Sequence, residues 1–399
     1  MRLVILSQYF PPETGAPQNR LFELAKGFIK EGWDISVITA MPNYPKGKIF
    51  EEYRGKFSTK EIIDGITVYR YWIFASNSTK SLLRILSMIS FSITAMFSLA
   101  AVKKIKPEYV LAESPPLTLS FTGYLLSLFS KAKLIMNVSD VWPLTAKELG
   151  YINDGFAYRC IEKLEKFLYK KSFLCTGQSE EIISHIKKYK KENTYLFRNG
   201  VDINRFRQPS VKNKQNNNFK IVYAGLLGVA QGIYSIVKNT DFKSLGAELH
   251  IYGDGPEKVE TAELISSNGG GNVYLHNSVG RNQIPELLDM YDCALIPLVK
   301  NIYGAVPSKI YEAMAAGLPV LFSGEGEGAE IILQNDSGLV SNAGDFRKLE
   351  ENILKLKTSE ELRNKLSRNG RKAAEDKFDR NKLIPELSKK LKNMTGKQC

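Results

Sequence analysis

The chain has 399 residues, enough to bury two hydrophobic cores, so two domains are the expected organisation. Hydrophobic residues make up 43% and charged residues 24% of the sequence, proportions that exclude general disorder. The net charge of +13 favours a polyanionic neighbour: an anionic membrane, a phosphorylated substrate or nucleic acid. Nucleic acid is the weakest candidate, because the sequence contains no zinc-finger spacing, helix-turn-helix or RNA-binding aromatic signature.

The first half of the chain predicts a doubly wound parallel sheet. Short β-rich runs alternate with helical stretches, and buried strands are expected at Arg2–Leu6, Ile35–Thr39, Tyr109–Ala112, Leu134–Val138 and Leu174–Gly177. Within Lys60–Tyr71, the pair Asp64-Gly65 predicts an antiparallel hairpin. The N-terminal apolar run is too short for a signal peptide and the cysteines form no C-x-x-C motif, so a cytoplasmic protein with reduced thiols is expected.

The segment Leu82–Val102 is apolar enough to resemble a membrane span, which needs about 20 apolar residues. Arg84, Ser87, Thr94 and Ser98 share one helical face, however, so the pattern is that of an amphipathic helix. Either this helix packs into a core or part of its surface touches lipid. Basic residues flank it, a rim that favours peripheral attachment to an anionic membrane surface: Lys80, Arg84, Lys103, Lys104 and Lys106.

Four loops follow predicted strands of the first half, where parallel strands end at a common edge. In the first, Ser7–Arg20, Gly15 permits close approach of a ligand, and Arg20 can pair with a phosphate near the start of a helix. The loops also contain the polar or aromatic residues Asn19, Asn43, Glu113, Asp140 and Trp142. Because the loops converge, we expect a ligand site at this edge. Asp140 has the alternative of capping the helix that follows it.

A polar stretch from Gln208 to Asn218 breaks the periodicity and predicts a linker. The second half repeats the α/β pattern, with strands expected at Ile221–Ala224, Glu248–Tyr252, Val273–His276, Ala294–Pro297 and Val320–Phe322. Gly225, Gly228 and Gly232 follow the first of these strands in a loop typical of phosphate binding. His250 and His276 fall in predicted strands and are expected to be core or edge residues, and His185 also lies away from the loops.

The run from Pro307 to Val320 is the most informative in the chain. Pro307 and Ser308 suit the start of a helix, whose free N–H groups can hold a diphosphate. Glu312 then lies just past the first turn, where its carboxylate can accept hydrogen bonds from ribose hydroxyls. Gly317 and Pro319 end the helix, and an acidic, glycine-rich turn up to Glu330 follows the next strand.

These residues closely resemble the donor-site signature of retaining glycosyltransferases of family 4. That family has the GT-B fold, an α/β fold of two Rossmann-like, doubly wound domains that face a central cleft. The resemblance implies an N-terminal Rossmann-like acceptor-binding domain over residues 1–207 and a C-terminal nucleotide-sugar-binding domain over residues 219–375. A helix over residues 376–399 is then expected to cross back to the first domain. The bacterial O-antigen and capsule subgroup, which includes N-acetyl-L-fucosamine transferases, is the most similar.

The chain departs from the family pattern at three positions. The family has two glutamates separated by seven residues, and the first of them falls on Gly304. Most members also place arginine and lysine where this chain has Leu226 and Gln231. The charge that neutralises a diphosphate is therefore expected from Lys309, with Arg198 and Arg281 as further candidates.

The resemblance also assigns roles to residues. Donor contacts are implied for Gly225, Gly228, Gln231, Arg198, Gly253, Ser308, Lys309, Glu312 and Glu330. Asp140 and Glu113 are the catalytic candidates, Asp140 being preferred, because the acceptor hydroxyl must be oriented or deprotonated and an oxocarbenium-like charge stabilised. The acceptor and phosphate loop would contain Gly15, Asn19, Arg20, Asn43 and Trp142. No D-x-D triplet occurs, so neither a metal nor another cofactor is expected.

The function implied is a cytoplasmic transferase of the hexosyltransferase type, peripheral on the inner membrane. It would move a sugar, by resemblance an N-acetylated deoxysugar, from a UDP-linked donor to a polyprenyl-diphosphate-linked glycan in O-antigen, capsule or lipopolysaccharide biosynthesis, with GDP as the second choice of nucleotide. One alternative is an isomerase similar to UDP-N-acetylglucosamine 2-epimerase, which the scarcity of histidine disfavours. Another is a non-catalytic scaffold in polysaccharide assembly, which the missing glutamate, arginine and lysine favour.

Overall fold

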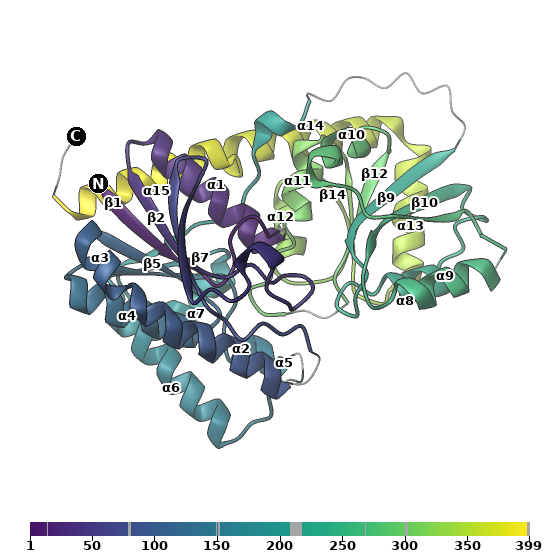
Figure 1. Cartoon of the computed structure of the whole chain (residues 1–399). Coiled ribbons are helices and arrows are strands. Elements are labelled where there is room, and N and C mark those ends of the chain that lie inside the picture. Colours follow the sequence, from purple (N-terminus) through teal and green to yellow (C-terminus); the bar gives the residue numbers. More distant parts are fainter. Residues whose placement is uncertain are drawn as a thin grey trace. The chain divides into compact units, whose positions relative to one another are not determined.

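The computed structural model describes residues 1–13, 15–78, 81–148, 150, 152–207, 218–267, 269–299 and 302–396. Its internal contacts divide the chain into two compact units (Figure 1). The first unit comprises Met1–Arg198 together with the chain from Ile384 onward, and the second comprises Asn199–Leu383. The expected linker residues 208–217, Lys80 of the expected basic rim and Thr14 of the first loop lie outside the described residues.

The first unit contains an eight-stranded sheet in the order β3-β4-β2-β1-β5-β6-β7-β8. The sheet is parallel except for the β3–β4 pair, and its strands are β1 (Arg2–Leu6), β2 (Asp34–Ala40), β3 (Ser58–Ile63), β4 (Ile66–Tyr71), β5 (Tyr109–Ser114), β6 (Lys133–Val138), β7 (Leu174–Gly177) and β8 (Thr194–Leu196). The five expected parallel strands and the hairpin are confirmed. Asp64 and Gly65 both have positive φ, the backbone that a two-residue hairpin turn requires.

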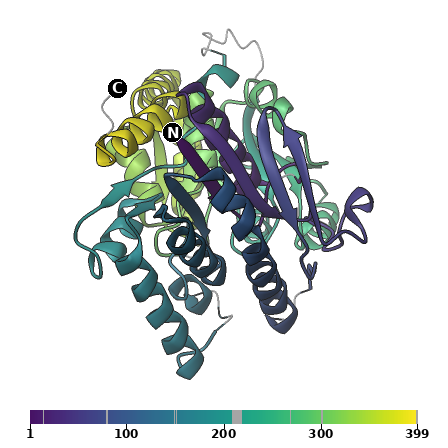
Figure 2. The ribbon, with the colours of Figure 1, turned by 60° about the vertical axis from the view of Figure 1, so that its left-hand side comes forward.

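Helices cover both faces of this sheet (Figures 1 and 2). One face packs on α2 (Ser81–Thr94), the 3-10 turn η2 (Ala95–Ser98), α3 (Leu99–Ile105) and α4 (Leu117–Ser130), which bury Phe91, Val102 and Leu126 in a core with Val4 and Leu6. The other helices of the unit are α1 (Ala16–Lys30), α5 (Leu144–Glu148), α6 (Phe156–Lys171) and α7 (Glu180–Lys187).

The C-terminal helix α15 (Arg380–Met394) completes the first unit from Ile384 onward. The indole of Trp33 donates a hydrogen bond to Ser388 (2.8 Å), and the Tyr109 hydroxyl donates to the carbonyl of Leu391 (2.8 Å). A side chain at Gly27 would collide with Ile384, so α1 and α15 approach closely. The last helix therefore supplies part of the core of the domain in which the chain begins.

The second unit contains a six-stranded parallel sheet in the order β11-β10-β9-β12-β13-β14. Its strands are β9 (Phe219–Leu226), β10 (Ala247–Asp254), β11 (Val273–His276), β12 (Cys293–Pro297), β13 (Val320–Ser323) and β14 (Gly338–Ser341), of which only β14 was not expected. Its helical elements are η3 (Ile203–Arg205), α8 (Ile233–Asn239), α9 (Lys258–Ser267), η4 (Arg281–Gln283), α10 (Ile284–Leu288), α11 (Lys309–Ala315), α12 (Glu327–Gln334), α13 (Phe346–Thr358) and α14 (Glu360–Lys377).

The second unit begins at Asn199, earlier in the chain than the end expected for the first domain at residue 207. Hydrogen bonds explain the difference. The amide of Val201 donates to the carbonyl of Phe378 (2.8 Å), and the amide of Arg380 donates to the carbonyl of Val201 (2.8 Å). The guanidinium of Arg380 also donates to the carbonyls of Asn199 and Gly200. The segment after residue 198 is thus fixed to the end of α14.

Candidate active site

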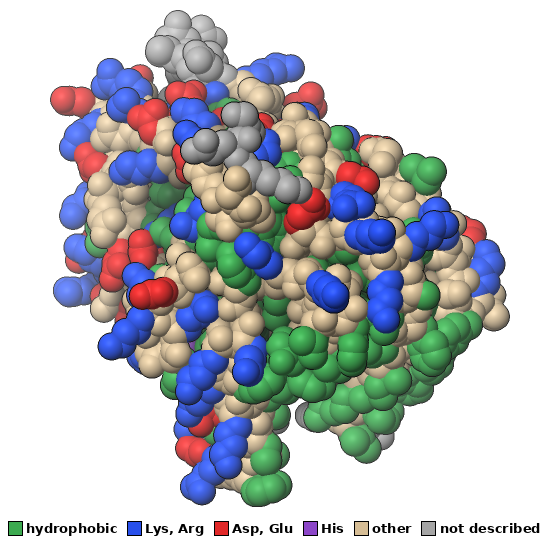
Figure 3. All heavy atoms as spheres, turned by 90° about the vertical axis from the view of Figure 1, so that its left-hand side faces the viewer, with side chains coloured by type: hydrophobic (Ala, Val, Ile, Leu, Met, Phe, Trp, Pro, Cys, Tyr) green, Lys and Arg blue, Asp and Glu red, His purple; other side chains and the backbone are tan. Residues whose placement is uncertain are grey.

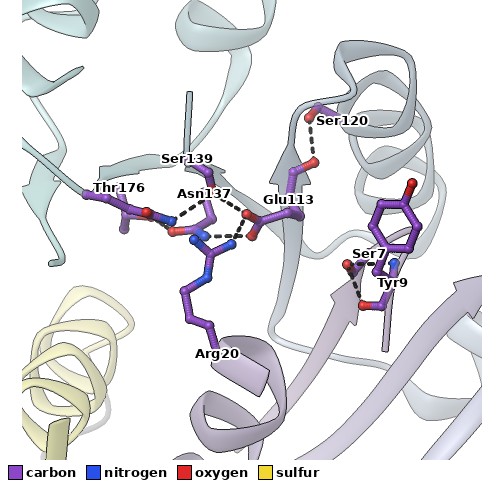
Figure 4. A network of polar contacts seen from close by, with 9 residues as sticks. Ser7, Tyr9, Arg20, Glu113, Ser120, Asn137, Ser139 and Thr176 are labelled. Atoms are coloured by element: carbon purple, nitrogen blue, oxygen red, sulfur yellow. Dashed lines mark hydrogen bonds and ion pairs between the residues drawn. The ribbon is translucent and has the colours of Figure 1, made fainter. Parts of the chain in front are cut away.

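A polar network lies at the carboxyl edge of the first unit's sheet, and its centre is the buried carboxylate of Glu113 at the end of β5 (Figure 4). Arg20 of α1 forms an ion pair with Oε1, and the hydroxyl of Ser139 donates to the same oxygen. The amide of Asn137 on β6 donates to Oε2 (2.7 Å). Because both oxygens already accept hydrogen bonds, Glu113 holds Arg20 and the end of β6 in place.

A second layer of side chains fixes these donors. Thr176 of β7 donates to the amide oxygen of Asn137 (2.6 Å), and Gln178 donates to the hydroxyl of Ser139 (2.7 Å). The network therefore crosses the ends of three neighbouring strands, β5, β6 and β7. No role was expected for Asn137, Thr176 or Gln178, because single polar residues in or next to strands give no periodic signal.

Asp140 lies directly after this network, in the loop that follows β6. Burial raises the pKa of its carboxyl above the ordinary value, the nearby Glu113 charge raises it further, and Arg20 opposes both effects. A raised pKa is a property of carboxyls that take part in proton transfer near neutral pH. Helix α5 begins at Leu144, and the preceding turn, in which the amide of Thr145 donates to the carbonyl of Val141 (2.8 Å), starts directly after Asp140.

The first loop and the loop after β2 are joined by a residue without an assigned role, Glu13. This buried carboxylate accepts from the amides of Asn43 (2.7 Å) and Tyr44 (2.8 Å), while burial raises its pKa and these bonds lower it. The side-chain amide of Asn43 donates to the carbonyl of Met41 (2.9 Å) and is buried. One N–H of Asn43 is thus used within its own loop, and its expected contact with a ligand stays a prediction.

The remaining first-unit candidates lie in the same loops. Gly15 has extended backbone and precedes α1, where its carbonyl accepts from the amide of Asn19 (3.1 Å). A Cβ atom at Gly15 would meet only the flexible end of the Gln18 side chain, and the expected close approach of a ligand stays a prediction. Trp142 is half-buried in the loop after Asp140.

The second unit gathers charged residues around Glu312 of α11. Burial raises the pKa of Glu312, and three cations lower it: Lys309, Arg205 and Arg281. Burial in turn lowers the pKa of each cation, and Glu312 opposes that shift. Arg205 of η3 donates to the carbonyl of Arg281 at the start of η4 (2.7 Å), which fixes the two elements to each other. Asp202 acts on both arginines in the same direction as Glu312, so three positive and two negative charges leave an excess of one positive charge.

Lys309 reaches from α11 to the end of β9. A Cβ atom added at Gly225 would lie 2.6 Å from the Lys309 ammonium nitrogen, and one at Gly253 would overlap the carbonyl of Gly225. The two glycines thus let neighbouring strand ends and a lysine side chain pack together. The cation lies beside the loop in which most family members carry an arginine and a lysine, and in which this chain has Leu226 and Gln231.

The other residues expected to contact the donor differ in burial and in position. Ser308 precedes the first residue of α11, and the Gln231 side-chain oxygen lies near Gly228 and is buried without a hydrogen-bond partner among the described residues. Glu330 is exposed on α12, where Glu327 is the buried carboxylate. Arg198 is the last residue of the first unit, and its expected contact with the donor stays a prediction.

Gly304 occupies the position of the family's first glutamate, and its backbone explains the difference. Its φ of 83° lies in the left-handed region, in a turn where the amide of Ala305 donates to the carbonyl of Ile302 (2.9 Å). A glutamate with this backbone would be strained, whereas glycine adopts it freely. Arg205, by contrast, is a cluster member that the sequence analysis missed. Its only signal was its place after the Asn199-Gly200-Val201-Asp202 segment.

The chain is similar to several known glycosyltransferases. Residues 204–373 match the family described as "Glycosyl transferases group 1". WcaI of Escherichia coli K12, named provisionally as a colanic acid biosynthesis glycosyl transferase, is 24% identical over 79% of this chain and 82% of its own length. The Staphylococcus aureus capsular polysaccharide biosynthesis glycosyltransferase CapM is 24% identical over 47% of this chain and 51% of its own length.

Solved structures show the fold over the whole chain. Sucrose-phosphate synthase from Thermosynechococcus elongatus superposes with a TM-score of 0.76 at 14% identity, covering 100% of both chains. Anabaena HepE in complex with UDP superposes with a TM-score of 0.73 at 17% identity, covering 98% of this chain and 100% of HepE. The fold is therefore that of the GT-B glycosyltransferases, and the Glu312 cluster lies within residues 204–373, the part of the chain that matches the group 1 family.

Proposed function

We propose that the protein is a retaining glycosyltransferase that moves a sugar from a UDP-linked donor to a polyprenyl-diphosphate-linked glycan at the cytoplasmic face of the inner membrane. The observation that carries the proposal is the cluster of Glu312 with Lys309, Arg205 and Arg281 within the matched domain. A role in capsule or other surface polysaccharide synthesis is supported by the similarity to WcaI and CapM.

The charge of the cluster suits a nucleotide diphosphate. The net positive charge complements a diphosphate, and guanidinium groups bind its oxygens through paired hydrogen bonds. The carboxyl oxygens of Glu312, whose pKa the three cations lower against the effect of burial, can accept hydrogen bonds from ribose hydroxyls. Because protein cations neutralise the leaving group, we propose that the reaction needs no metal. Transfer activity in excess EDTA should equal transfer activity in buffer. Loss of activity in EDTA would contradict the proposal that no metal is needed.

The first unit supplies the groups for the acceptor. Asp140 is the proposed residue that orients or deprotonates the acceptor hydroxyl, because burial raises its pKa and the Glu113 network fixes its neighbours. Arg20, held by Glu113, limits that rise by its positive charge. Glu113 itself is proposed as a positioning residue, since both of its oxygens accept hydrogen bonds within the protein.

Calorimetric titration tests the donor site directly. The wild-type protein, titrated with UDP, GDP, ADP and CMP, should bind one nucleoside diphosphate, UDP, with preference. Glu312→Gln should weaken this binding by about 1–3 kcal/mol, the range for hydrogen bonds to a charged group. Glu361→Gln, at an exposed position on α14, is the control and should bind as the wild type does.

Three results would change the proposal. Unchanged affinity in Glu312→Gln would reject the ribose contact. Binding of none of the four nucleotides by a folded protein would favour the non-catalytic scaffold, for which the glycine at position 304 is the supporting observation. Isomerisation of the nucleotide sugar in the absence of any acceptor would favour the epimerase.

A further inference from the structure

The continuous helical segment formed by α2, η2 and α3 has its faces reversed relative to a soluble protein. Its buried side carries hydroxyl residues beside Phe91 and Ala95, namely Ser87, Ser92, Thr94 and Ser98. Its outer side carries large apolar residues in one stripe, Leu82, Ile85, Leu86, Ile89, Ile93 and Phe97, exposed by 37–68%. A helix on the surface of a soluble protein normally turns its apolar stripe to the core.

The hydroxyl face is bonded to the rest of the first unit. Thr94 donates to the carbonyl of Trp72 (2.6 Å), and Ser92 donates to the hydroxyl of Thr118 on α4 (2.9 Å). Thr122 of α4 donates in turn to the carbonyl of Ser92 (2.7 Å). Residues 82–105 are long and apolar enough to cross a membrane by length and composition. The segment nevertheless belongs to the domain core, and leaving it would break these bonds.

Helix α4 repeats the reversal beside α2. Its buried residues include Ser120, Thr122 and Ser127, whereas Phe121, Leu128 and Phe129 are exposed by 38–56%. Phe57 packs edge-to-face on Phe97 with ring centroids 5.2 Å apart, which extends the apolar area to the β3 side. Figure 3 shows hydrophobic side chains gathered over one part of this side of the molecule, with lysine and arginine side chains along its border. Contiguous apolar patches of this kind on a protein surface mark interaction sites.

A basic hollow lies where this helical segment and α4 both end. Its volume is about 660 Å³, and its lining includes Arg2, Lys103, Lys106, Lys131 and Lys133. Phe129, which belongs to the apolar area, lines the same hollow. Glu108 is the one carboxylate among the lining residues, and it is already paired with Arg2 (3.8 Å) and accepts from its backbone amide (2.7 Å). The hollow is thus strongly positive and continuous with the apolar area.

We propose that the apolar stripe of residues 82–97, the outer side of α4 and this basic hollow together form a docking surface for an anionic lipid bilayer. The segment from 81 to 105 lies in the plane of the interface, where a helix of this length covers roughly 36 Å. Its apolar side chains enter the acyl boundary, and the lysines of the hollow bind lipid phosphate. The charge border argues for lipid over a second copy of this chain, because a surface this positive repels itself. This inference rests on the proposed function in one respect: the purpose of docking is to bring the enzyme to a lipid-linked acceptor.

Vesicle sedimentation with the full chain tests the proposal. Wild-type protein should sediment with vesicles of phosphatidylcholine containing about 30% phosphatidylglycerol, and much less with phosphatidylcholine alone or in 0.5 M salt. Ile93→Glu with Phe97→Glu should abolish sedimentation. The matched control is Leu333→Glu on α12, at a residue exposed to a similar degree (61%), which should sediment like the wild type.

The hollow has its own pair of variants. Lys103→Gln with Lys106→Gln should reduce partitioning about 30-fold, because each lysine near an anionic surface contributes about 1 kcal/mol, a factor of about five. Lys187→Gln with Lys191→Gln, exposed lysines on and after α7, should have a smaller effect. Equal losses in the two double variants would overturn the assignment of the hollow, because they would show only an effect of net charge.

A native reporter checks the depth of insertion. Trp72 is partly exposed beside the segment, since its carbonyl accepts from Thr94. Its fluorescence should be quenched by lipids brominated on their acyl chains, and Trp72→Phe should remove the quenching. Wild-type protein that stays in solution, or that sediments without quenching, would overturn the proposal of a docking surface.

A dimer of the wild-type protein in solution would also overturn the proposal if the double variant Ile93→Glu with Phe97→Glu were monomeric. UDP binding, measured separately on the same variants, should not change, so a failure of docking is distinguishable from a failure of the transferase proposal.

Discussion

Glu113 and Glu312 are both carboxylates surrounded by polar groups, one in each unit, but their surroundings differ in kind. Glu113 accepts hydrogen bonds from three side chains and, with Asp140, shares the single cation Arg20. Glu312 is influenced by three cations. Two carboxylates with one guanidinium give a net charge of −1 in the first site, whereas three cations with Glu312 and Asp202 give +1 in the second. A negative site that raises a carboxyl pKa suits proton handling on a neutral hydroxyl, and a positive site suits a phosphate anion.

The largest effect should follow from Asp140→Asn. General acid–base groups contribute about 10²–10⁴-fold to a rate, so transfer activity should fall by that factor. Burial raises the pKa of Asp140, which means that the ionised form costs folding free energy, so the amide should not lower the melting temperature. Activity, UDP affinity and thermal unfolding should be measured together. Full activity would remove Asp140 from the mechanism, and a large loss of UDP affinity would break the division between the two sites.

Lys309→Gln should have an intermediate effect, confined to the positive site. Loss of a charged hydrogen-bonding group should weaken UDP binding by about 10–100-fold and leave uridine binding nearly unchanged. Gly225→Ala should act in the same direction, because its methyl group would meet the Lys309 side chain. Lys238→Gln, exposed on α8, serves as the control. Equal weakening toward uridine and UDP would mean that Lys309 supports the fold of the site rather than the diphosphate.

The smallest expected effect concerns acid stability of the second unit. His276 lies 3.1 Å from a ring nitrogen of His250 and stacks on Tyr252, and burial together with His250 lowers its pKa. The unfolded chain therefore binds the proton more tightly, and stability falls as the pH drops below about 6.5. Between pH 7.5 and pH 5, the wild type should lose about 1–3 °C more in melting temperature than His276→Asn. An identical pH response in both proteins would assign the acid sensitivity to other groups.

Much of the fold could be predicted because its signals are local. Buried parallel strands are short β-rich runs, and Asp64-Gly65 specifies its hairpin by backbone conformation alone. The Pro307–Val320 run likewise placed Lys309 and Glu312 on one short helix. These elements depend on residues adjacent in the chain, so the sequence determines them without knowledge of their neighbours.

The rest depends on contacts that no local pattern contains. Arg205 and Arg281 approach Glu312 from two separate 3-10 turns, and Thr176 supports Glu113 only through Asn137. The apolar segment of residues 82–105 is a further example. Its periodicity predicts an apolar face and a hydroxyl-bearing face, but it does not tell which of the two is buried. The hydrogen bond of Ser92 to Thr118 on α4 shows that the hydroxyl-bearing face lies inside.

The return of α15 to the first unit has a consequence for biosynthesis. A ribosome adds about 5–20 residues per second, and a domain normally folds as soon as its own residues have emerged. Here the hydrogen-bond partners of Trp33 and Tyr109 are Ser388 and Leu391, which are synthesised after the whole second unit. The N-terminal domain therefore stays unfinished until α15 has been synthesised. A chain released before α15 would expose that open core to cellular proteases, so completion of the first domain reports that the second unit has been made.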